Sequence, residues 1–230
     1  MVRIVTVYPD LLGTYGDRGN GIVLERRCGL RGIAAEHVAA SSDAPLPRAD
    51  VYCVGGGEDG PQQLAVERLA RDGTLAGAVG DGAVVLAVCA GLQVLGRSFP
   101  TPAGRADGLG LLPVDTVGPD GPRAVGEVVV ESGAHGPLTG FENHAGRTVR
   151  DPGAPALGVV VLGIGNGDGT DGVVAGRLVG TYLHGPVLAR NPVLADWLLE
   201  VAIGAPLAPI DDLPAARLHD ERLAAARRGR

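Results

Sequence analysis

The sequence has 230 residues and an apolar fraction of 45%, which is enough for one folded domain with its own core. Its longest apolar runs fall short of the roughly 18 residues that a bilayer-spanning helix needs, and no signal-peptide pattern begins the chain. Twenty basic residues, all Arg, against 26 acidic ones give a net charge of −6, which disfavours binding to nucleic acid or anionic membranes. We expect a cytoplasmic protein with no membrane span.

The three cysteines, Cys28, Cys53 and Cys89, are widely spaced, and no CxxC motif occurs. This spacing argues against both a disulfide framework and a structural zinc site, and we expect no metal site in the chain. Cys53 lies in a strand-like apolar run and Cys28 near the end of a predicted helix, and we interpret both as structural cysteines.

The first half of the chain alternates strand-like and helix-like segments, which predicts an α/β fold. The wholly apolar run before Cys89 is typical of a strand buried on both faces of a parallel sheet. In chain order we expect a strand at Val2–Val7, a helix at Gly19–Leu30, strands at Ile33–Val38 and Val51–Val54, a helix from Pro61 to about Arg71, and a strand at Ala83–Val88.

The segment Phe99–Gly172 is dense in Gly and Pro, and we expect irregular and antiparallel structure there at one edge of the sheet. Its candidate strands are Ala124–Val130, Leu157–Leu162 and Gly172–Ala175, and a strand at Val179–Leu183 and a helix at Asn191–Ile203 follow. We therefore place one domain at residues 1–203 and a tail at 204–230, in which Ala215–Arg228 forms either a charged helix or a frayed end.

Cys89 is the strongest candidate for chemistry. It stands in Val84–Gln93 (VVLAVCAGLQ), where a buried strand leads through small residues into a helix. This is the pattern of a nucleophile elbow, in which a tight turn lifts the side chain out of the sheet. The helix N-terminus favours the thiolate, and the N–H that follows the nucleophile can stabilise an oxyanion. The alternative is a buried structural cysteine.

A glycine-rich stretch, Gly55–Gly60 (GGGEDG), follows one predicted strand and precedes a helix. It matches neither GxGxxG nor GxxxxGK[ST], and Glu58 and Asp59 would repel a phosphate. We favour a backbone amide directed at a developing oxyanion, and a plain strand–helix turn is the alternative.

A thiol nucleophile needs a base, and His184 is the leading candidate among five histidines. It lies just past a predicted strand, where rigid scaffolds present catalytic side chains. His144, in the Gly-rich middle, is a second candidate that could line a cleft. An ordinary buried histidine is the alternative for both.

Together these residues resemble the class I (triad) glutamine amidotransferases, in particular the cobyric-acid-synthase-like branch. The Cys89 elbow, the Gly55–Gly57 loop and Tyr182–Gly185 (YLHG) occur in the order of that family. The resemblance implies a three-layer class I glutamine amidotransferase fold with a mostly parallel central sheet and helices on both faces. Most triad members carry an acid two residues after the histidine, but here that position is Pro186. We therefore expect a partner to supply the missing acid.

Within that branch the segments Tyr8–Leu12 (YPDLL), Tyr15–Asn20 (YGDRGN) and Gly55–Asp59 look like those of the glutaminase subunits of lipid II isoglutaminyl synthases. The similarity covers about residues 2–203. It implies Cys89 as nucleophile, His184 as acid and base, the amides near Gly57 and Ala90 as oxyanion hole, and Arg123 as ligand of the glutamine α-carboxylate.

The resemblance further implies a heterodimer with a Mur-ligase-like subunit of the MurT type, which amidates D-glutamate of the lipid II stem peptide in peptidoglycan synthesis. We expect L-glutamine as the substrate, no cofactor in this chain, and ATP and Mg on the partner. Three alternatives stay open: a glutaminase component of a cobyrinate-type amidotransferase, a Cys–His hydrolase of another elbow-bearing type, and a catalytically silent scaffold that binds a partner.

Overall fold

The computed structural model describes residues 1–119 and 121–228. Within these residues the strands form three sheets, of which the largest has six strands in the order β13-β14-β4-β3-β1-β2. Five of its strands are parallel, and β13 pairs antiparallel with β14 at one edge. The six strands are β1 (Val2–Val7), β2 (Ala35–Ala40), β3 (Val51–Val54), β4 (Val84–Val88), β13 (Val173–Ala175) and β14 (Leu178–Thr181).

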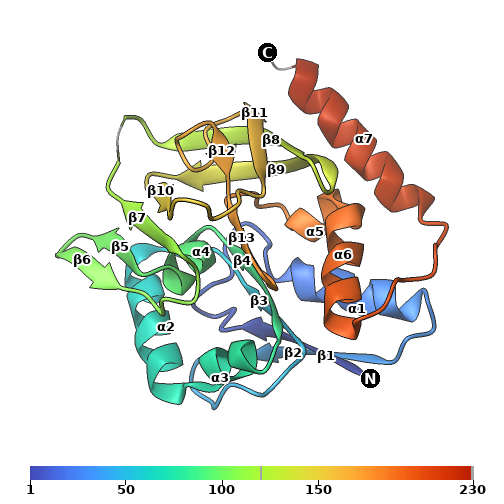
Figure 1. Cartoon of the computed structure of the whole chain (residues 1–230), viewed down its shortest axis with the longest axis horizontal. Helices are drawn as coiled ribbons and strands as arrows, with labels where there is room; N and C mark the ends of the chain where they lie inside the picture. Colours follow the sequence, from blue (N-terminus) through green and yellow to red (C-terminus); the bar gives the residue numbers. More distant parts are fainter. Residues whose placement is uncertain (120, 229–230) are drawn as a thin grey trace.

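Helices cover both faces of this central sheet. Figure 1 shows α2, α3 and α4 on one side and α1 and α6 on the other, which gives the three layers that the sequence predicts. The helices are α1 (Gly19–Gly29), α2 (Asp59–Asp72), α3 (Thr74–Gly80), α4 (Ala90–Leu95), α5 (Val187–Arg190), α6 (Pro192–Ile203) and α7 (Leu213–Arg228).

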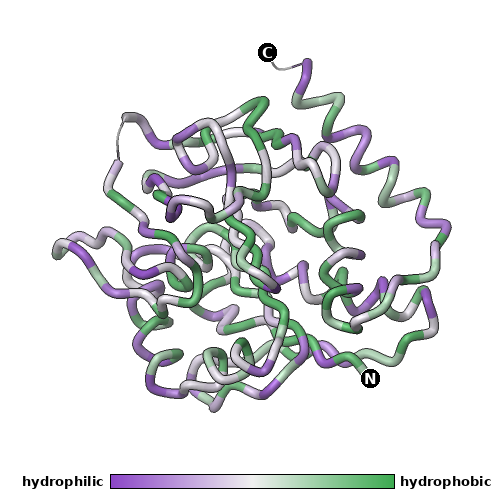
Figure 2. The backbone as a smooth tube through the Cα atoms, in the orientation of Figure 1, coloured by the Kyte–Doolittle hydropathy of each residue, from purple (hydrophilic) through white to green (hydrophobic). Residues whose placement is uncertain are grey.

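The central strands are hydrophobic because both of their faces are covered. Every residue of β3, β4 and β14 is buried, and these strands stand out as hydrophobic segments in Figure 2. The strands predicted at Val2–Val7 and Val51–Val54 have the observed bounds, whereas the strand predicted at Ile33–Val38 lies two residues later.

The middle of the chain is largely antiparallel, and it has strands at the three predicted places, but it is more regular than the predicted sheet edge. It forms two further four-stranded sheets, ordered β10-β7-β5-β6 and β12-β11-β8-β9. Strands β8 and β9 are nine residues long and pair along their whole length, so long-range pairing outweighs the local Gly and Pro turn signals. The strands are β5 (Ser98–Thr101), β6 (Gly104–Asp107), β7 (Val114–Val117), β8 (Ala124–Ser132), β9 (Gly136–His144), β10 (Arg147–Arg150), β11 (Gly158–Leu162) and β12 (Thr170–Asp171).

The C-terminal segment is helical, as one of the two sequence interpretations expects. The apolar side of α7 places Leu223 and Ala226 against Val129 and Leu162 of the β8–β11 sheet. Figure 2 shows the rest of this helix as largely hydrophilic. Within residues 1–119 and 121–228, none of the helices combines the length and hydrophobicity needed to cross a bilayer.

Close packing behind the β4–α4 turn leaves no room for a side chain at Gly91. An added Cβ would stand 2.4 Å from the carbonyl oxygen of Val54. We expect Gly91→Ala to lower the free energy of unfolding by about 1–3 kcal/mol, the usual cost of overpacking, in urea denaturation. Gly80→Ala is the matched control, because nothing lies within 4 Å of its added Cβ. Equal stability of the two variants would contradict the packing argument.

Candidate active site

Cys89 occupies the sharp turn between β4 and α4. Its backbone has a φ of 52° and a ψ of −106°, a region that residues other than glycine rarely adopt. The Cys89 N–H donates to the carbonyl of Thr181 at 2.8 Å, which ties the turn to the end of β14. The turn therefore has the strained geometry expected of a nucleophile elbow, and strain of this kind is concentrated at functional sites.

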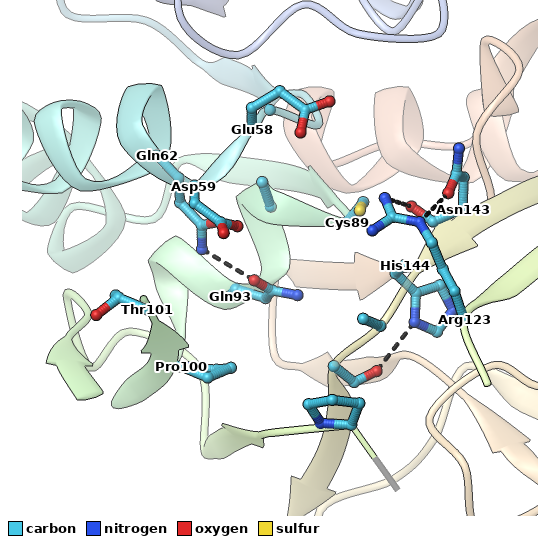
Figure 3. A pocket seen from close by; sticks show the side chains of 15 residues that line it. Glu58, Asp59, Gln62, Cys89, Gln93, Pro100, Thr101, Arg123, Asn143 and His144 are labelled. Atoms are coloured by element: carbon cyan, nitrogen blue, oxygen red, sulfur yellow. Dashed lines mark hydrogen bonds between the residues drawn. The ribbon is translucent and has the colours of Figure 1, made fainter. Parts of the chain in front are cut away.

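The Cys89 side chain reaches a pocket of about 250 Å³. Gly57, Ala90 and Arg123, the other residues singled out from the sequence on this side, line the same pocket (Figure 3). In that view the carboxylate of Asp59 lies across the pocket from the guanidinium of Arg123, and that of Glu58 lies above the pocket. The pocket thus offers a thiol, a cationic group and two anionic groups to a small zwitterionic ligand.

The triple glycine exists because its backbone packs closely against two other segments. An added Cβ would lie 2.5 Å from the Leu12 carbonyl oxygen at Gly55 and 2.6 Å from Cε1 of His184 at Gly56. The N–H of Gly56 donates to Asp17 at 2.9 Å. The N–H groups of Gly57 and Ala90 have no acceptor within the described part of the chain, so both can donate to a ligand.

His184 is fully buried, and its backbone is held in place by β9. It exchanges two backbone hydrogen bonds with Phe141, at 2.9 and 3.1 Å. The side chain donates from Nδ1 to Oδ2 of Asp17 at 2.8 Å, and both side chains are excluded from solvent. Nε2 of His184 is buried and has no hydrogen-bond partner in residues 1–119 and 121–228.

This environment favours the protonated imidazole. Burial alone lowers the pKa of His184, but the hydrogen bond to Asp17 and the neighbouring Cys89 sulfur outweigh it and raise the pKa to about 10. A positively charged His184 therefore lies next to the Cys89 sulfur.

Asp17 supplies from this chain the acid that we expected from a partner. It lies on the loop between β1 and α1, and its carboxylate contacts Nδ1 of His184 at 2.8 Å. We expected a partner to provide the carboxylate next to His184, and this expectation was wrong, because Asp17 of the same chain provides it. Asp17 belongs to the YGDRGN segment, but it is 167 positions away from His184, and no local pattern links them.

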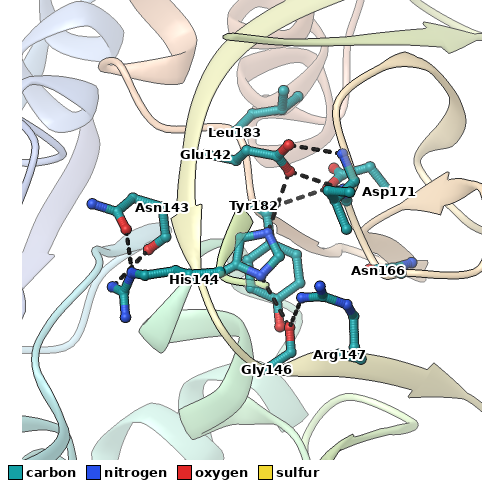
Figure 4. A network of polar contacts seen from close by, with 12 residues as sticks. Glu142, Asn143, His144, Gly146, Arg147, Asn166, Asp171, Tyr182 and Leu183 are labelled. Carbon is teal, nitrogen blue, oxygen red and sulfur yellow. Dashed lines mark hydrogen bonds and ion pairs between the residues drawn. The ribbon is translucent and has the colours of Figure 1, made fainter. Parts of the chain in front are cut away.

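His144 also lines the pocket, but its ring is already engaged (Figure 4). Nδ1 lies 3.0 Å from the carbonyl of Gly146, and Nε2 lies 3.3 Å from Oε2 of Glu142. The ring stacks on Tyr182 with centroids 3.7 Å apart. Of the two candidates, His184 is therefore the one with a nitrogen available to Cys89.

The other two cysteines are buried, as expected of structural residues. Burial raises the pKa of Cys53 to about 12 and also raises that of Cys28, so both stay as thiols near neutral pH. In the part of the chain that the structure describes, no three His, Cys, Asp or Glu side chains group as metal ligands would.

A cysteine elbow at the end of a central parallel strand, with a histidine after the neighbouring strand, is the arrangement of the class I glutamine amidotransferases. The chain belongs to the CobB/CobQ-like glutamine amidotransferase domain family, whose model matches residues 3–192. It is an enzyme of the glutamine amidotransferase type.

Two relatives and one solved structure show where the chain lies in this family. It is 39% identical to the lipid II isoglutaminyl synthase (glutamine-hydrolyzing) subunit GatD of Staphylococcus aureus (strain N315), over 89% of this chain and 88% of that protein. It is 32% identical to GatD of Streptococcus pneumoniae (strain ATCC BAA-255 / R6), over 88% and 80% of the two chains. A crystal structure of a glutamine amidotransferase matches 88% of this chain and 99% of its own, with a TM-score of 0.62 and 22% identity, which supports the fold.

Replacing Asp17 with Asn tests the source of the raised pKa. We expect the pKa of His184 to fall from about 10 toward its ordinary value of 6.5, because the anionic partner is lost. A raised pKa stabilises the fold fully below pH 6.5, and this contribution disappears as the pH rises through about 10. The wild-type chain should thus lose stability over this range, and Asp17→Asn should lose less.

NMR titration of the imidazole and urea unfolding across the range measure both effects. Asp81→Asn is the control, since that exposed carboxylate pairs with Arg48 on the surface. An unchanged His184 titration in Asp17→Asn would refute the assignment.

Proposed function

We propose that this chain is the glutaminase subunit of a lipid II isoglutaminyl synthase. It hydrolyses L-glutamine to glutamate and ammonia, and a Mur-ligase-like, ATP-dependent partner of the MurT type uses the ammonia to amidate D-glutamate of the lipid II stem peptide. The observation that carries the proposal is Cys89, strained on its elbow, beside a His184 whose other nitrogen is bound to Asp17. The similarity to GatD along most of the chain supports the choice of acceptor.

The pocket suits the two ends of glutamine. The guanidinium of Arg123 pairs with the α-carboxylate, and the carboxylates of Glu58 and Asp59 attract the α-ammonium group. With its α-carbon held between these groups, the side-chain carboxamide is directed toward Cys89. Recognition of both charges restricts the site to free amino acids of this size.

The chemistry proceeds through a covalent intermediate. The Cys89 thiolate attacks the carboxamide carbon, and the N–H groups of Gly57 and Ala90 hold the oxyanion. When the carbon–nitrogen bond breaks, Nε2 of His184 gives its proton to the leaving nitrogen, and ammonia is released. His184 then takes a proton from water, which attacks the γ-glutamyl thioester and yields glutamate and the free thiolate–imidazolium pair.

The amidation itself is assigned to the partner subunit. The glycine-rich stretch after β3 packs against Leu12 and His184, and its neighbours are acidic, so it does not serve as a phosphate cradle. We place ATP and Mg on the partner, in a cytoplasmic heterodimer. Since Asp17 supplies the acid, the partner is not needed to complete the catalytic group.

Glutamate release from L-glutamine, with and without the partner, tests the proposal. Cys89→Ala should abolish release, because no other group in the pocket can form the thioester. A glutamine-like diazo or chloroketone reagent should label Cys89 and be blocked by glutamine. Cys28→Ala, a change at a buried cysteine outside the pocket, is the control. Unlabelled Cys89 and no glutamate release with the partner present would favour the scaffold alternative.

Co-purification distinguishes the lipid II assignment from the cobyrinate-type alternative. A Mur-ligase-like protein recovered with this chain supports the lipid II assignment. A cobalamin-pathway enzyme recovered in its place would favour the cobyrinate-type alternative and leave the glutaminase chemistry intact.

Arg123→Ala should raise the KM for glutamine at least tenfold and change kcat little, because the charge pair with the α-carboxylate is made in both the ground state and the transition state. Steady-state kinetics provide the measurement. Arg105→Ala is the matched control, since that arginine pairs with Asp115 at the surface. A large loss of kcat with an unchanged KM would argue against a binding role.

A further inference from the structure

Tyr15 covers the buried His184. The two rings meet edge to face with centroids 4.9 Å apart, and the ring centroid of Phe141 lies 5.9 Å from that of Tyr15. Tyr15 is 44% exposed, whereas His184 has no exposed surface. Its backbone φ is 55°, an unfavourable value for a bulky side chain, so neighbouring contacts must hold it there.

The hydroxyl of Tyr15 provides one such contact. Nδ2 of Asn143 donates to Oη of Tyr15, and Oδ1 of the same amide accepts from Nε of Arg123. A guanidinium has donors only, so it must face the amide oxygen, and this fixes which end of Asn143 points to Tyr15. The backbone carbonyl of Asn143 accepts a second bond from Nη2 of Arg123 at 3.3 Å.

These contacts connect Arg123, which lines the pocket, with Tyr15, whose ring lies against His184. Arg123 precedes β8, Asn143 lies near the end of β9, and Tyr15 lies on the loop that also carries Asp17. Figure 3 shows the Arg123 guanidinium turned toward Asn143 on the Cys89 side of the pocket. An exposed arginine has many rotamers, so fixing two of its nitrogens on Asn143 directs the remaining one toward a ligand and lowers the entropy lost on binding.

We propose that Tyr15 and Asn143 are positioning residues that hold Arg123 ready for the α-carboxylate of glutamine and connect that subsite to His184. This inference rests on the proposed glutaminase function. Neither residue has a step of its own in the proposed chemistry. They contribute to substrate selection, because they act through Arg123, the group that we assign to the α-carboxylate of glutamine.

A pair of substrates separates this role from a general structural one. L-Glutamine carries the α-carboxylate, and its α-amide, in which that group is a neutral carboxamide, does not. We expect Tyr15→Phe to lower kcat/KM for glutamine about five- to tenfold, mainly through KM, as the loss of one supporting hydrogen bond implies. Hydrolysis of the α-amide should stay within about twofold of wild type, because that substrate gains little from Arg123.

Tyr52→Phe is the matched control. Tyr52 lies on β3, outside the pocket. The substitution removes a hydroxyl that accepts from the N–H of Ala49 and donates to the carbonyl of Pro47, two residues that precede this strand. Its preference for glutamine over the α-amide should match that of wild type. Equal losses on both substrates in Tyr15→Phe, or no loss on either, would overturn the inference.

Asn143→Ala completes the experiment. If the three side chains act as one chain, Asn143→Ala reduces the same preference, and adding Tyr15→Phe to it has no further effect. Additive losses would refute the connection. All assays use the chain together with its ligase partner. If the wild-type protein releases no glutamate, the proposed function itself is refuted. If the wild type is active and Tyr15→Phe keeps the same preference for glutamine over the α-amide, only the positioning role is refuted.

Discussion

The contact between Asp17 and His184 is the constraint on which the site depends. Both side chains are fully buried, and a buried charge is costly unless it is paired and hydrogen-bonded. Oδ2 of Asp17 accepts from the His184 ring and from the N–H of Gly56, whereas Oδ1 is buried and has no partner in residues 1–119 and 121–228. The loops that follow β1, β3 and β14 are therefore fixed together at the carboxyl edge of the central sheet, which is where Cys89 also emerges.

The contact between Asp17 and His184 also limits which residues can stand next to it. Gly56 lacks a side chain because the His184 ring occupies that space, so the glycines serve close approach in addition to any role as amide donors. Cys89 and Tyr15 both have a positive φ although neither is glycine. Two strained residues on either side of one buried pair show that packing and hydrogen bonds here outweigh local backbone preference. The loop after β1 contributes an acid to one side of His184 and an aromatic cover to another.

Features that depend on adjacent residues could be predicted from the sequence. The buried strand before Cys89, the small residues after it, the glycines after β3 and the position of His184 just past a strand each carry a local signal, and the resemblance added Arg123. The contacts of Asp17 and of Tyr15 could not be predicted, because each joins loops that are far apart in the chain and meet only through the strand order. In the middle region the sequence predicted strands β8 and β11 and antiparallel pairing, but not the partner strand β9 or the separate sheets, because these depend on pairing between distant segments.

The two buried histidines differ in function because their nitrogens face different partners. His144 lies between the Gly146 carbonyl and Glu142, and Glu142 is itself fixed by the N–H groups of Ile164 and Gly165 at 2.7 and 2.9 Å (Figure 4). A ring with both nitrogens occupied holds the pocket wall but cannot shuttle a proton to sulfur. His184 has one nitrogen on a carboxylate that favours its charge, and its other nitrogen has no partner in the described residues, which is the state that a proton donor to a leaving group requires. The hydrogen-bond partners of the two rings, and not their nearness to the cysteine, are therefore what distinguishes His184 from His144.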